Sequence, residues 1–341
     1  MMRCCATPVE FQAVLRTLTY ANTNDSNLSD SDRTLTLKVT DTSGSGTAES
    51  SAAAMTLNVT GDNDRPEIVE GWSETVIYTE GAGATKLAEN LVLSDADAGS
   101  DADGAGGKLR EAVVVIEHYV AGEDEFRVGV AGSEAVLGAQ SAGTGTGVEG
   151  ITMSASASGG TLTVTFSATA GATPAEFQTV LQTLTYANQS QSPTETAREL
   201  TLTVKDSSGG AEATSAESTM TLQVLGVNDA PTVTIGQLSV AENETKKIGS
   251  SDLQASDVDT ADGASELIYT VKELPAHGTL IVDGEALTQS AVADGTASFT
   301  QSDIDSEKVA YRHNGDEGES DSFRFTLSDD DGEPLAGGEQ A

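Results

Sequence analysis

The chain has 341 residues, of which 54 are Asp or Glu and 17 are Lys or Arg, so its formal net charge is −37. This charge is opposite to the cationic surface that binds nucleic acid or anionic membranes, and we predict neither partner. The only cysteines are Cys4 and Cys5, so the chain is not a disulfide scaffold. No apolar run approaches the about 18 residues of a membrane-spanning helix, and no direct membrane insertion is expected.

The first patterned segment returns later in the chain. Residues 6–22 read ATPVEFQAVLRTLTYAN, and residues 172–188 read ATPAEFQTVLQTLTYAN. Likewise AAMTLNVTGDNDRP at residues 53–66 returns as STMTLQVLGVNDAP at residues 218–231. A period of about 165 residues is the length of one domain, so the sequence predicts a tandem array of domains.

Each copy of the first segment predicts a short helix that leads into a strand with the sequence LTYAN. Thr7 and Thr173 are N-cap candidates, each followed by a first-turn proline and a capping-box glutamate. Apolar residues follow at helical spacing, and we expect them to face a core. They are Phe11, Val14, Leu15 and Leu18 in the first copy and Phe177, Val180, Leu181 and Leu184 in the second.

Apolar and polar residues alternate at residues 35–39, 162–166, 200–204 and 220–224. This period of two predicts half-buried antiparallel strands, and the Gly-, Ser- and Asp-rich stretches between them predict turns. A divergent third copy occupies residues 302–311 and is followed by a strand-like segment over residues 322–327. The sequence therefore predicts an all-β fold of tandem immunoglobulin-like antiparallel β-sandwiches, each with a short helix.

Two prolines, Pro66 and Pro231, mark the predicted boundaries between repeats. We expect the C-terminal part of a repeat over residues 1–65, a complete repeat over residues 66–230, and a C-terminally truncated repeat over residues 231–341. The partial repeats at both ends suggest that the chain is a fragment of a longer array. The first residues, MMRCCATP, contain no signal peptide, which for a fragment is weak evidence about location.

Acidic residues recur in register around the boundaries. A glutamate follows each boundary, and an Asp-x-Asp pair comes 15 residues after that glutamate. The recurring residues are Asp62-Asn63-Asp64 and Asn228-Asp229 before the prolines, Glu80 and Glu242 after them, the pairs Asp95/Asp97 and Asp257/Asp259, and the strand-end residues Asp41, Asp206 and Asp329. Charge alone fits a solvated surface, but this repeated placement favours binding of a hard divalent cation.

The order of these elements resembles the calcium-binding layout of cadherin repeats, through AENE at residues 241–244 and ASDVD at residues 255–259. The middle repeat, with SDAD at residues 94–97 and AGED at residues 121–124, resembles the cadherin-like repeats of large bacterial surface adhesins. The last repeat, with PAHGTL at residues 275–280 and FTQSDID at residues 299–305, resembles the chondroitin-sulphate-proteoglycan type. The resemblance implies cadherin-like β-sandwiches that are joined by Ca²⁺ in a cell-surface or extracellular protein.

Two calcium sites follow from the resemblance. The first junction would use Asp62, Asn63, Asp64, Asp95, Asp97 and Asp206. The second junction would use Glu80, Asn228, Asp229, Asp257, Asp259 and Asp329. Calcium takes six to eight oxygens, which two domain ends and a linker can supply together. Glu242 and Asp41 would serve junctions largely outside this chain.

The sequence also departs from the cadherin pattern. Gly61 and Gly226 stand where the cadherin linker usually has an aspartate, and Arg65 and Ala230 replace an asparagine. We therefore expect fewer ions per junction than cadherins hold, with dissociation constants of roughly 10⁻⁴–10⁻³ M. The alternative is that these residues form Asx turns and solvated strand ends that need no metal. The sequence near Asp101 resembles the start of an EF-hand calcium loop, but the later residues do not have the spacing of its ligands. We therefore interpret this segment as an acidic insert.

The predicted function is non-catalytic: a calcium-stabilised segment of a large adhesion protein that acts as a rigid spacer or adhesion module. Its expected partners are other repeats of the array and a cell-surface or matrix protein or glycan. One alternative is a carbohydrate- or matrix-binding module. An exposed aromatic platform would favour it, and Trp72 is the only tryptophan. The other alternative is a set of accessory repeats of a secreted enzyme. No nucleophile elbow or phosphate loop is present, and two Cys and three His do not complete a zinc site.

Overall fold

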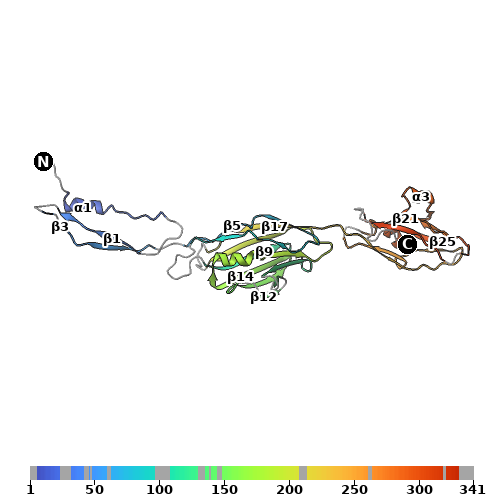
Figure 1. Ribbon diagram of the computed structural model, residues 1–341, viewed down its shortest axis with the longest axis horizontal. Helices are drawn as coiled ribbons and strands as arrows, with labels where there is room; N and C mark the ends of the chain where they lie inside the picture. Colours follow the sequence, from blue (N-terminus) through green and yellow to red (C-terminus); the bar gives the residue numbers. More distant parts are fainter. Residues whose placement is uncertain are drawn as a thin grey trace.

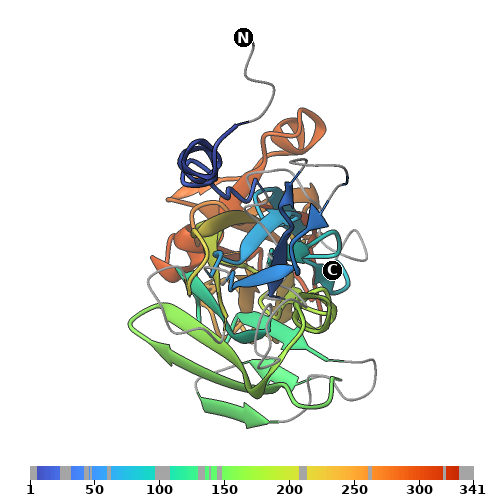
Figure 2. The ribbon, with the colours of Figure 1, turned by 90° about the vertical axis from the view of Figure 1, so that its left-hand side faces the viewer.

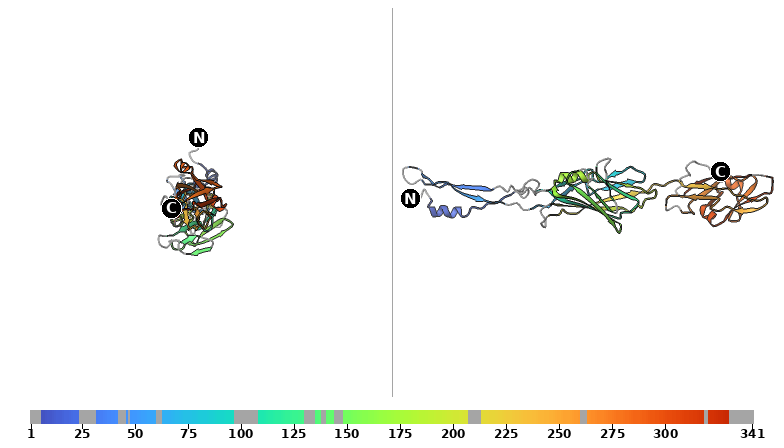
Figure 3. Two further views of the ribbon diagram at one scale, coloured as in Figure 1. Left: turned by 90° about the vertical axis from the view of Figure 1, so that its right-hand side faces the viewer. Right: turned by 90° about the horizontal axis from the view of Figure 1, so that it is seen from below.

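The computed structural model describes residues 6–23, 32–41, 46, 48–59, 63–96, 108–129, 135–137, 140–143, 148–206, 213–259, 263–317 and 320–329. They form three β-rich units, which we call the N-terminal unit (residues 6–59), the middle unit (residues 67–225) and the third unit (residues 232–329). Figure 1 shows the three units in a row along the long axis of the molecule. The view from below in Figure 3 shows the same linear arrangement, and in the end-on view of Figure 2 the three units overlap.

Among its described residues, the middle unit contains two large sheets, a separate two-stranded sheet and one helix. Its seven-stranded sheet has the order β12-β13-β14-β9-β16-β17-β6, its four-stranded sheet has the order β11-β10-β15-β7, and β5 pairs separately with β8. The elements are β5 (Glu67–Glu70), β6 (Thr75–Thr79), β7 (Thr85–Lys86), β8 (Val92–Ser94), β9 (Leu109–Glu117), β10 (Asp124–Val128), β11 (Ala135–Leu137), β12 (Gln140–Gly143), β13 (Thr152–Ser158), β14 (Thr161–Ala172), α2 (Pro174–Leu181), β15 (Thr185–Asn188), β16 (Arg198–Asp206) and β17 (Ser218–Leu225).

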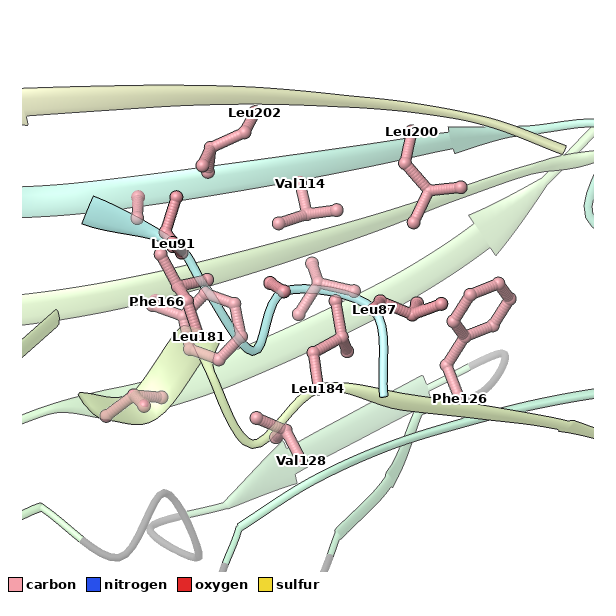
Figure 4. Packing of buried hydrophobic residues seen from close by; sticks show 14 of the residues in the cluster. Leu87, Leu91, Val114, Phe126, Val128, Phe166, Leu181, Leu184, Leu200 and Leu202 are labelled. Carbon is pink, nitrogen blue, oxygen red and sulfur yellow. The ribbon is translucent and has the colours of Figure 1, made fainter. Parts of the chain in front are cut away.

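The core of the middle unit lies between these sheets, as Figure 4 shows for Leu200 and Leu202 of β16, Val114 of β9 and Phe166 of β14. The alternation of the sequence places every second side chain of β16 in this core. Each large apolar side chain that is fully buried contributes about 1.5–3 kcal/mol to folding.

The helix α2 begins as the sequence predicts. The Thr173 hydroxyl accepts from the Glu176 backbone N at 3.2 Å, and the Glu176 Oε2 accepts from the Thr173 backbone N at 2.7 Å, which completes the capping box. The expected apolar stripe is buried: Phe177, Val180 and Leu181 are each 0% exposed.

The third unit has its own core, formed by residues between Ile248 and Leu327. Its sheets have the orders β19-β25-β22-β23 and β24-β21-β26, with β18 paired to β20. The elements are β18 (Thr232–Ile235), β19 (Thr245–Lys247), β20 (Leu253–Ser256), β21 (Ile268–Glu273), β22 (Gly278–Val282), β23 (Glu285–Ala286), α3 (Gln289–Ala293), β24 (Ser298–Thr300), α4 (Gln301–Asp305), β25 (Val309–His313) and β26 (Arg324–Ser328). The helix and strand predicted over residues 302–311 are thus confirmed as α4 and β25.

The N-terminal unit is smaller. It contains α1 (Pro8–Leu15) and two antiparallel strand pairs, β1 (Arg33–Leu37) with β4 (Ala53–Leu57) and β2 (Thr40–Asp41) with β3 (Ala48–Glu49). The helix has the same capping box as α2, formed by Thr7 and Glu10.

The expectation that the apolar stripe of α1 faces a core is wrong for this structure. Phe11 is 51% exposed, Val14 69%, Leu15 40% and Leu18 65%. The helix α2 packs against β8 and β9 of the middle unit, whereas no residue of α1 is buried among the described elements of the N-terminal unit. The predicted strand at residues 18–22 is not formed either, although its counterpart β15 pairs with both β10 and β7.

Trp72 lies in the core of the middle unit. Trp72 is 0% exposed, and its Nε1 donates to the Leu200 carbonyl oxygen at 3.2 Å. Trp72 is therefore a core residue rather than part of an exposed aromatic platform. Among the helices of the described segments, none combines the length and apolar character needed to cross a membrane.

Candidate metal centres at the unit junctions

The second junction joins the end of the middle unit to the third unit through the linker that follows β17. The Asn228 Nδ2 donates to the Asp329 Oδ2 at 2.9 Å, across 101 residues of sequence. Asp329 follows β26 and is only 2% exposed. The linker asparagine and the strand-end aspartate of the next unit therefore meet, as the sequence predicted for this junction.

The Asp-x-Asp pair after β20 also contacts this linker. The Asp229 backbone N donates to the Asp259 Oδ2 at 2.8 Å, and the Asp259 backbone N donates to the Asp257 Oδ1 at 2.9 Å. The second contact is an Asx-type turn that holds the two aspartates together. Both aspartates are partly buried where the linker enters the third unit.

Glu80 reaches the same linker from the middle unit. Its backbone N donates to the Leu225 carbonyl oxygen at 2.9 Å, and its Oε2 accepts from the Val227 backbone N at 3.0 Å. The residue that follows β6 is thus placed beside the end of β17, because these two strands pair in parallel. Residues 225–229 are therefore bordered by carboxylates from both units.

Two carboxylate oxygens at the second junction are buried without a hydrogen-bond partner, the Glu80 Oε1 and the Asp257 Oδ2. A buried polar atom that makes no hydrogen bond costs about 1–3 kcal/mol, and more when it is charged. Anionic oxygen is also the ligand that Ca²⁺ prefers. The donor set at this junction therefore fits a hard divalent cation.

These carboxylates are hydrogen-bonded to the linker rather than gathered around one point. Within the ranges that the structure describes, no three His, Cys, Asp or Glu side chains already converge at metal-binding distance. Coordination of an ion would therefore require some side chains to rotate away from backbone donors toward a common centre. The Asn228 amide and backbone carbonyls of the linker are additional oxygen donors of the kind that calcium accepts.

The first junction repeats part of this pattern. The Asn63 Nδ2 donates to the Asp206 Oδ2 at 3.0 Å and to the Asp64 carbonyl oxygen at 2.9 Å. Asp206 is 6% exposed and Asp95 is 7% exposed, and one side-chain oxygen of Asp64 is also buried. The contact between a linker asparagine and a strand-end aspartate thus occurs at both junctions, at Asn63 with Asp206 and at Asn228 with Asp329.

Other residues of the sequence prediction lie elsewhere. Asp62 and Asp97 of the first site, and the acidic insert with Asp101, are outside the described residues. Glu242 and Asp41 are exposed, and the junctions proposed for them are not part of the structure.

Sequence reasoning missed a loop that supports the second junction, residues 189–197. The Gln191 Nε2 donates to the Asp229 Oδ2 at 3.4 Å, and the Glu195 Oε1 accepts from the Gly226 backbone N at 2.8 Å. Neither residue belongs to a recurring motif, and the counterpart of the loop in the first copy falls largely on residues that are not described.

A buried ion pair anchors this loop. The guanidinium of Arg198 binds both carboxylate oxygens of Asp124, with Nη2 to Oδ1 at 2.8 Å and Nε to Oδ2 at 3.0 Å, and both side chains are 0% exposed. Its Nη1 donates to the carbonyl oxygens of Thr194 and Thr196. Tyr186 also donates its hydroxyl to the Asp124 Oδ1 at 2.7 Å. Burial first, and then the bond to Asp124, raise the pKa of the Tyr186 hydroxyl well above its ordinary value.

Comparison with known proteins bears mainly on the third unit. A family model described as cadherin-like matches residues 231–335. This part of the chain is therefore similar to cadherin-like domains. It begins at the proline that ends the linker and includes the Asp257 and Asp259 pair and Asp329.

Curated extracellular proteins are similar to about a third of the chain. FRAS1-related extracellular matrix protein 2 of Homo sapiens is 35% identical over 102 residues, which are 30% of this chain and 3% of that protein. Extracellular matrix organizing protein FRAS1 of Mus musculus is 35% identical over 112 residues, or 33% of this chain and 3% of the relative. Chondroitin sulfate proteoglycan 4 of Homo sapiens is 34% identical over 113 residues, or 32% of this chain and 4% of the relative. The chain thus spans a small fraction of each relative.

Solved cadherin structures also align with the chain. Mouse cadherin-23 EC22-24 aligns with 89% of this chain and 70% of its own, at 16% identity and a TM-score of 0.30. Mouse protocadherin-24 EC1-3 aligns with 90% of this chain and 76% of its own, at 11% identity and a TM-score of 0.34.

Proposed function

We propose that the second junction binds Ca²⁺ and that the bound ion holds the middle and third units in line, so that the chain acts as a stiffened, non-catalytic segment of an extracellular adhesion protein. The observation that carries the proposal is the pair of buried carboxylate oxygens without hydrogen-bond partners, the Glu80 Oε1 and the Asp257 Oδ2. They belong to different units and border one short linker.

Electrostatics supports a role for the ion in the geometry of the junction. Glu80, Asp229, Asp257 and Asp259 contact residues 225–229 or one another there, and the chain as a whole has a net charge of −37. Without a cation, these carboxylates repel one another, and the linker is expected to swing. With a cation, ligands from both units are held together and the junction stiffens.

The first junction is proposed to work in the same way, with Asn63, Asp64, Asp95 and Asp206 as its described ligands. Its support is the repeated contact between a linker asparagine and a strand-end aspartate. Asp62 and Asp97 complete this proposed set. The linker glycines Gly61 and Gly226 leave fewer carboxylates than a full cadherin linker has, and we therefore propose one or two weakly bound ions per junction.

The surroundings of the protein are proposed from its relatives, whose names place them in the extracellular matrix. We propose an extracellular or cell-surface location, with partners among matrix or surface proteins, glycans and further repeats of an array. The assignment of the middle unit to the type of cadherin-like repeat found in large bacterial adhesins is a proposal that rests on its motifs alone. The buried position of Trp72 removes the aromatic platform that would have favoured a carbohydrate-binding module.

Thermal unfolding of the full chain in chelator, in about 5 mM calcium and in matched magnesium tests the proposal. For dissociation constants of roughly 10⁻⁴–10⁻³ M, calcium at this concentration should stabilise the folded state by about 1–2 kcal/mol. The double variant Glu80→Gln, Asp257→Asn should lose the part of this response that comes from the second junction, because it removes the two buried anionic oxygens while nearly keeping side-chain shape.

The control is Asp283→Asn, which removes one carboxylate from an exposed turn of the third unit. Asp283 has a φ of +50°, and asparagine tolerates this left-handed conformation. The control should keep the calcium response of the wild type. An equal response of the wild type and the double variant, or no response at all, would contradict the proposed site.

A further inference from the structure

The chain contains five Asn-x-Ser/Thr triplets, the acceptor sequence for an N-linked glycan in secreted proteins. Their asparagines are Asn24, Asn27, Asn58, Asn188 and Asn243. The structure describes all three residues of two of these triplets, those of Asn188 and Asn243. The surroundings of these two asparagines differ in every respect that matters for carrying a glycan.

Asn188 is half-buried at the end of β15, and its side chain is fully engaged. Its Nδ2 donates to the Tyr186 hydroxyl oxygen at 3.0 Å and to the Asp124 Oδ1 at 3.3 Å, and its Oδ1 accepts from the Ser190 backbone N at 2.8 Å. Asp124 is 6% exposed and pairs with Arg198. A sugar on this nitrogen would remove one of the two donated hydrogen bonds and displace the groups around a buried ion pair. The folded middle unit therefore excludes a glycan at Asn188.

Asn243 lies in an exposed turn of the third unit, and its carboxamide has no hydrogen-bond partner among the described residues. It is the third residue of a turn over residues 241–244, which the Glu244 backbone N closes by donating to the Ala241 carbonyl oxygen at 3.1 Å. Its φ is +61°, a conformation that asparagine adopts more readily than most residues. The turn therefore presents this side chain at the surface, where a sugar on Nδ2 would break no hydrogen bond.

The neighbours of Asn243 contact its side chain without burying it. Its carboxamide lies over Gly315, where an added Cβ would overlap the Asn243 Oδ1. Thr245, the hydroxyl residue of the triplet, begins β19 and is exposed, and Glu244 between the two is exposed as well. The complete triplet therefore lies at the surface of the folded third unit.

The turn lies at the end of the third unit that is away from the second junction. The Glu244 carbonyl oxygen accepts from the backbone N of His313, the last residue of β25, at 3.0 Å. Tyr311 of the same strand donates its hydroxyl to Asp321, which precedes β26, at 2.8 Å. Asp329, a proposed calcium ligand, follows the other end of β26. A glycan on the turn would therefore leave the proposed calcium ligands of the second junction accessible.

We propose that Asn243 is an acceptor of an N-linked glycan and that Asn188 is not. The co-reactant is an oligosaccharide linked to a lipid through a diphosphate. A bond forms between the anomeric carbon of its first sugar and the Asn243 Nδ2, which loses one proton, and the bond from that carbon to the diphosphate oxygen breaks, so that the lipid diphosphate leaves. The inference rests on the proposed extracellular location, because this transfer takes place on chains that enter the secretory route.

Production of the full chain behind a cleavable secretion signal in cultured animal cells tests the proposal. Chains from the medium and from the cells are treated with a glycosidase that converts a glycan-bearing asparagine to aspartate, and are then cut with trypsin. Residues 206–246 and residues 128–198 form separate tryptic peptides, so mass spectrometry measures Asn243 and Asn188 independently. Of these two peptides, only residues 206–246 should show the conversion, and only after glycosidase treatment.

Two substitutions at the exposed Thr245 form a matched pair. Thr245→Ala removes the hydroxyl of the triplet and should abolish the modification of Asn243, whereas Thr245→Ser keeps the hydroxyl and should retain it. Gly159→Asn is a positive control, because it creates an Asn-Gly-Thr triplet in the exposed turn between β13 and β14. Gly159 and Gly160 both have positive φ there, as the Asn-Gly type I′ turn requires. This variant should gain one glycan in the peptide of residues 128–198.

An unmodified Asn243 in the wild-type chain would overturn the proposal, most directly where the Gly159→Asn chain gains its glycan. A glycan that persists on Asn243 in Thr245→Ala would overturn it as well, as would a glycan on Asn188 in secreted wild-type chains. The calcium response is measured separately, on chain made in bacteria without this glycan. Failure of the calcium proposal and failure of the glycan proposal are therefore distinguishable.

Discussion

The two copies of the helical segment allow one substitution to be compared in two environments. Phe177 is completely buried against the sheets of the middle unit, whereas its counterpart Phe11 is 51% exposed. Phe177→Ala should lower the free energy of unfolding of the middle unit by about 3–5 kcal/mol, which combines the lost transfer free energy with the cavity left behind. Phe11→Ala leaves no buried cavity and should change that free energy by less than about 0.5 kcal/mol.

Urea denaturation followed by tryptophan fluorescence measures this difference in the middle unit alone. Trp72 is the only tryptophan of the chain, and it lies in the same buried cluster as Phe177. Its signal therefore reports the middle unit without interference from the other two. With a wild-type slope m of about 1–3 kcal/mol/M, the midpoint of Phe177→Ala should fall by at least about 1 M urea.

The reasoning would be refuted by a Phe11→Ala variant whose Trp72 transition shifts as far as that of Phe177→Ala. It would be refuted equally by a Phe177→Ala variant with an unchanged midpoint. The first result would mean that α1 is covered by the middle unit, and the second that α2 does not contribute to its core.

Three further predictions concern charged groups. Asp124→Asn should lower the free energy of unfolding by about 3–5 kcal/mol, read by the same fluorescence, because it leaves the buried guanidinium of Arg198 without its counter-charge. Backbone and hydroxyl donors of the N-cap threonine lower the pKa of Glu176 from 4.5. Glu176→Gln should therefore lower the free energy of unfolding by at most about 1 kcal/mol at neutral pH, since the carboxylate is exposed. In urea titrations, this difference from the wild type should disappear as pH falls below 4.5 through the lowered pKa, because the carboxylate is then protonated. The hydrogen bond and charge of Asp316 raise the pKa of His277 above 6.5, so an NMR titration should give a higher value than in Asp316→Asn.

Local features of the fold were predictable from sequence because they depend on neighbouring residues. The capping boxes at Thr7 and Thr173 form as expected, since each needs only residues within one helical turn. The alternation over residues 200–204 and 220–224 likewise gave β16 and β17, since the side-chain period of a strand is independent of its partners.

Features that depend on distant partners were not predictable in the same way. The apolar stripe around Phe11 has the pattern of a core helix, but burial also requires strands to cover it. The Asp124 and Arg198 pair is separated by 74 residues and belongs to no recurring motif, so no spacing in the sequence indicates it.

The candidate site likewise contains residues that were predicted before the structure and residues that only the fold revealed. The resemblance to cadherin repeats implied that Asn228 and Asp329 belong to one junction, and the structure places them in contact. The loop residue Glu195, which accepts from the linker at Gly226, has no register signal and became visible only through the fold. The resemblance thus implied which residues share a junction, while the supporting loop became visible only in the three-dimensional arrangement.

The central claim is that the carboxylates of the second junction hold calcium between two units. Calorimetric titration of calcium into the full chain, the Glu80→Gln, Asp257→Asn variant and the Asp283→Asn control tests it most directly. We expect the wild type and the control to bind with dissociation constants of roughly 10⁻⁴–10⁻³ M, and the double variant to lose at least one ion from the stoichiometry. Superimposable isotherms for all three proteins would contradict the account.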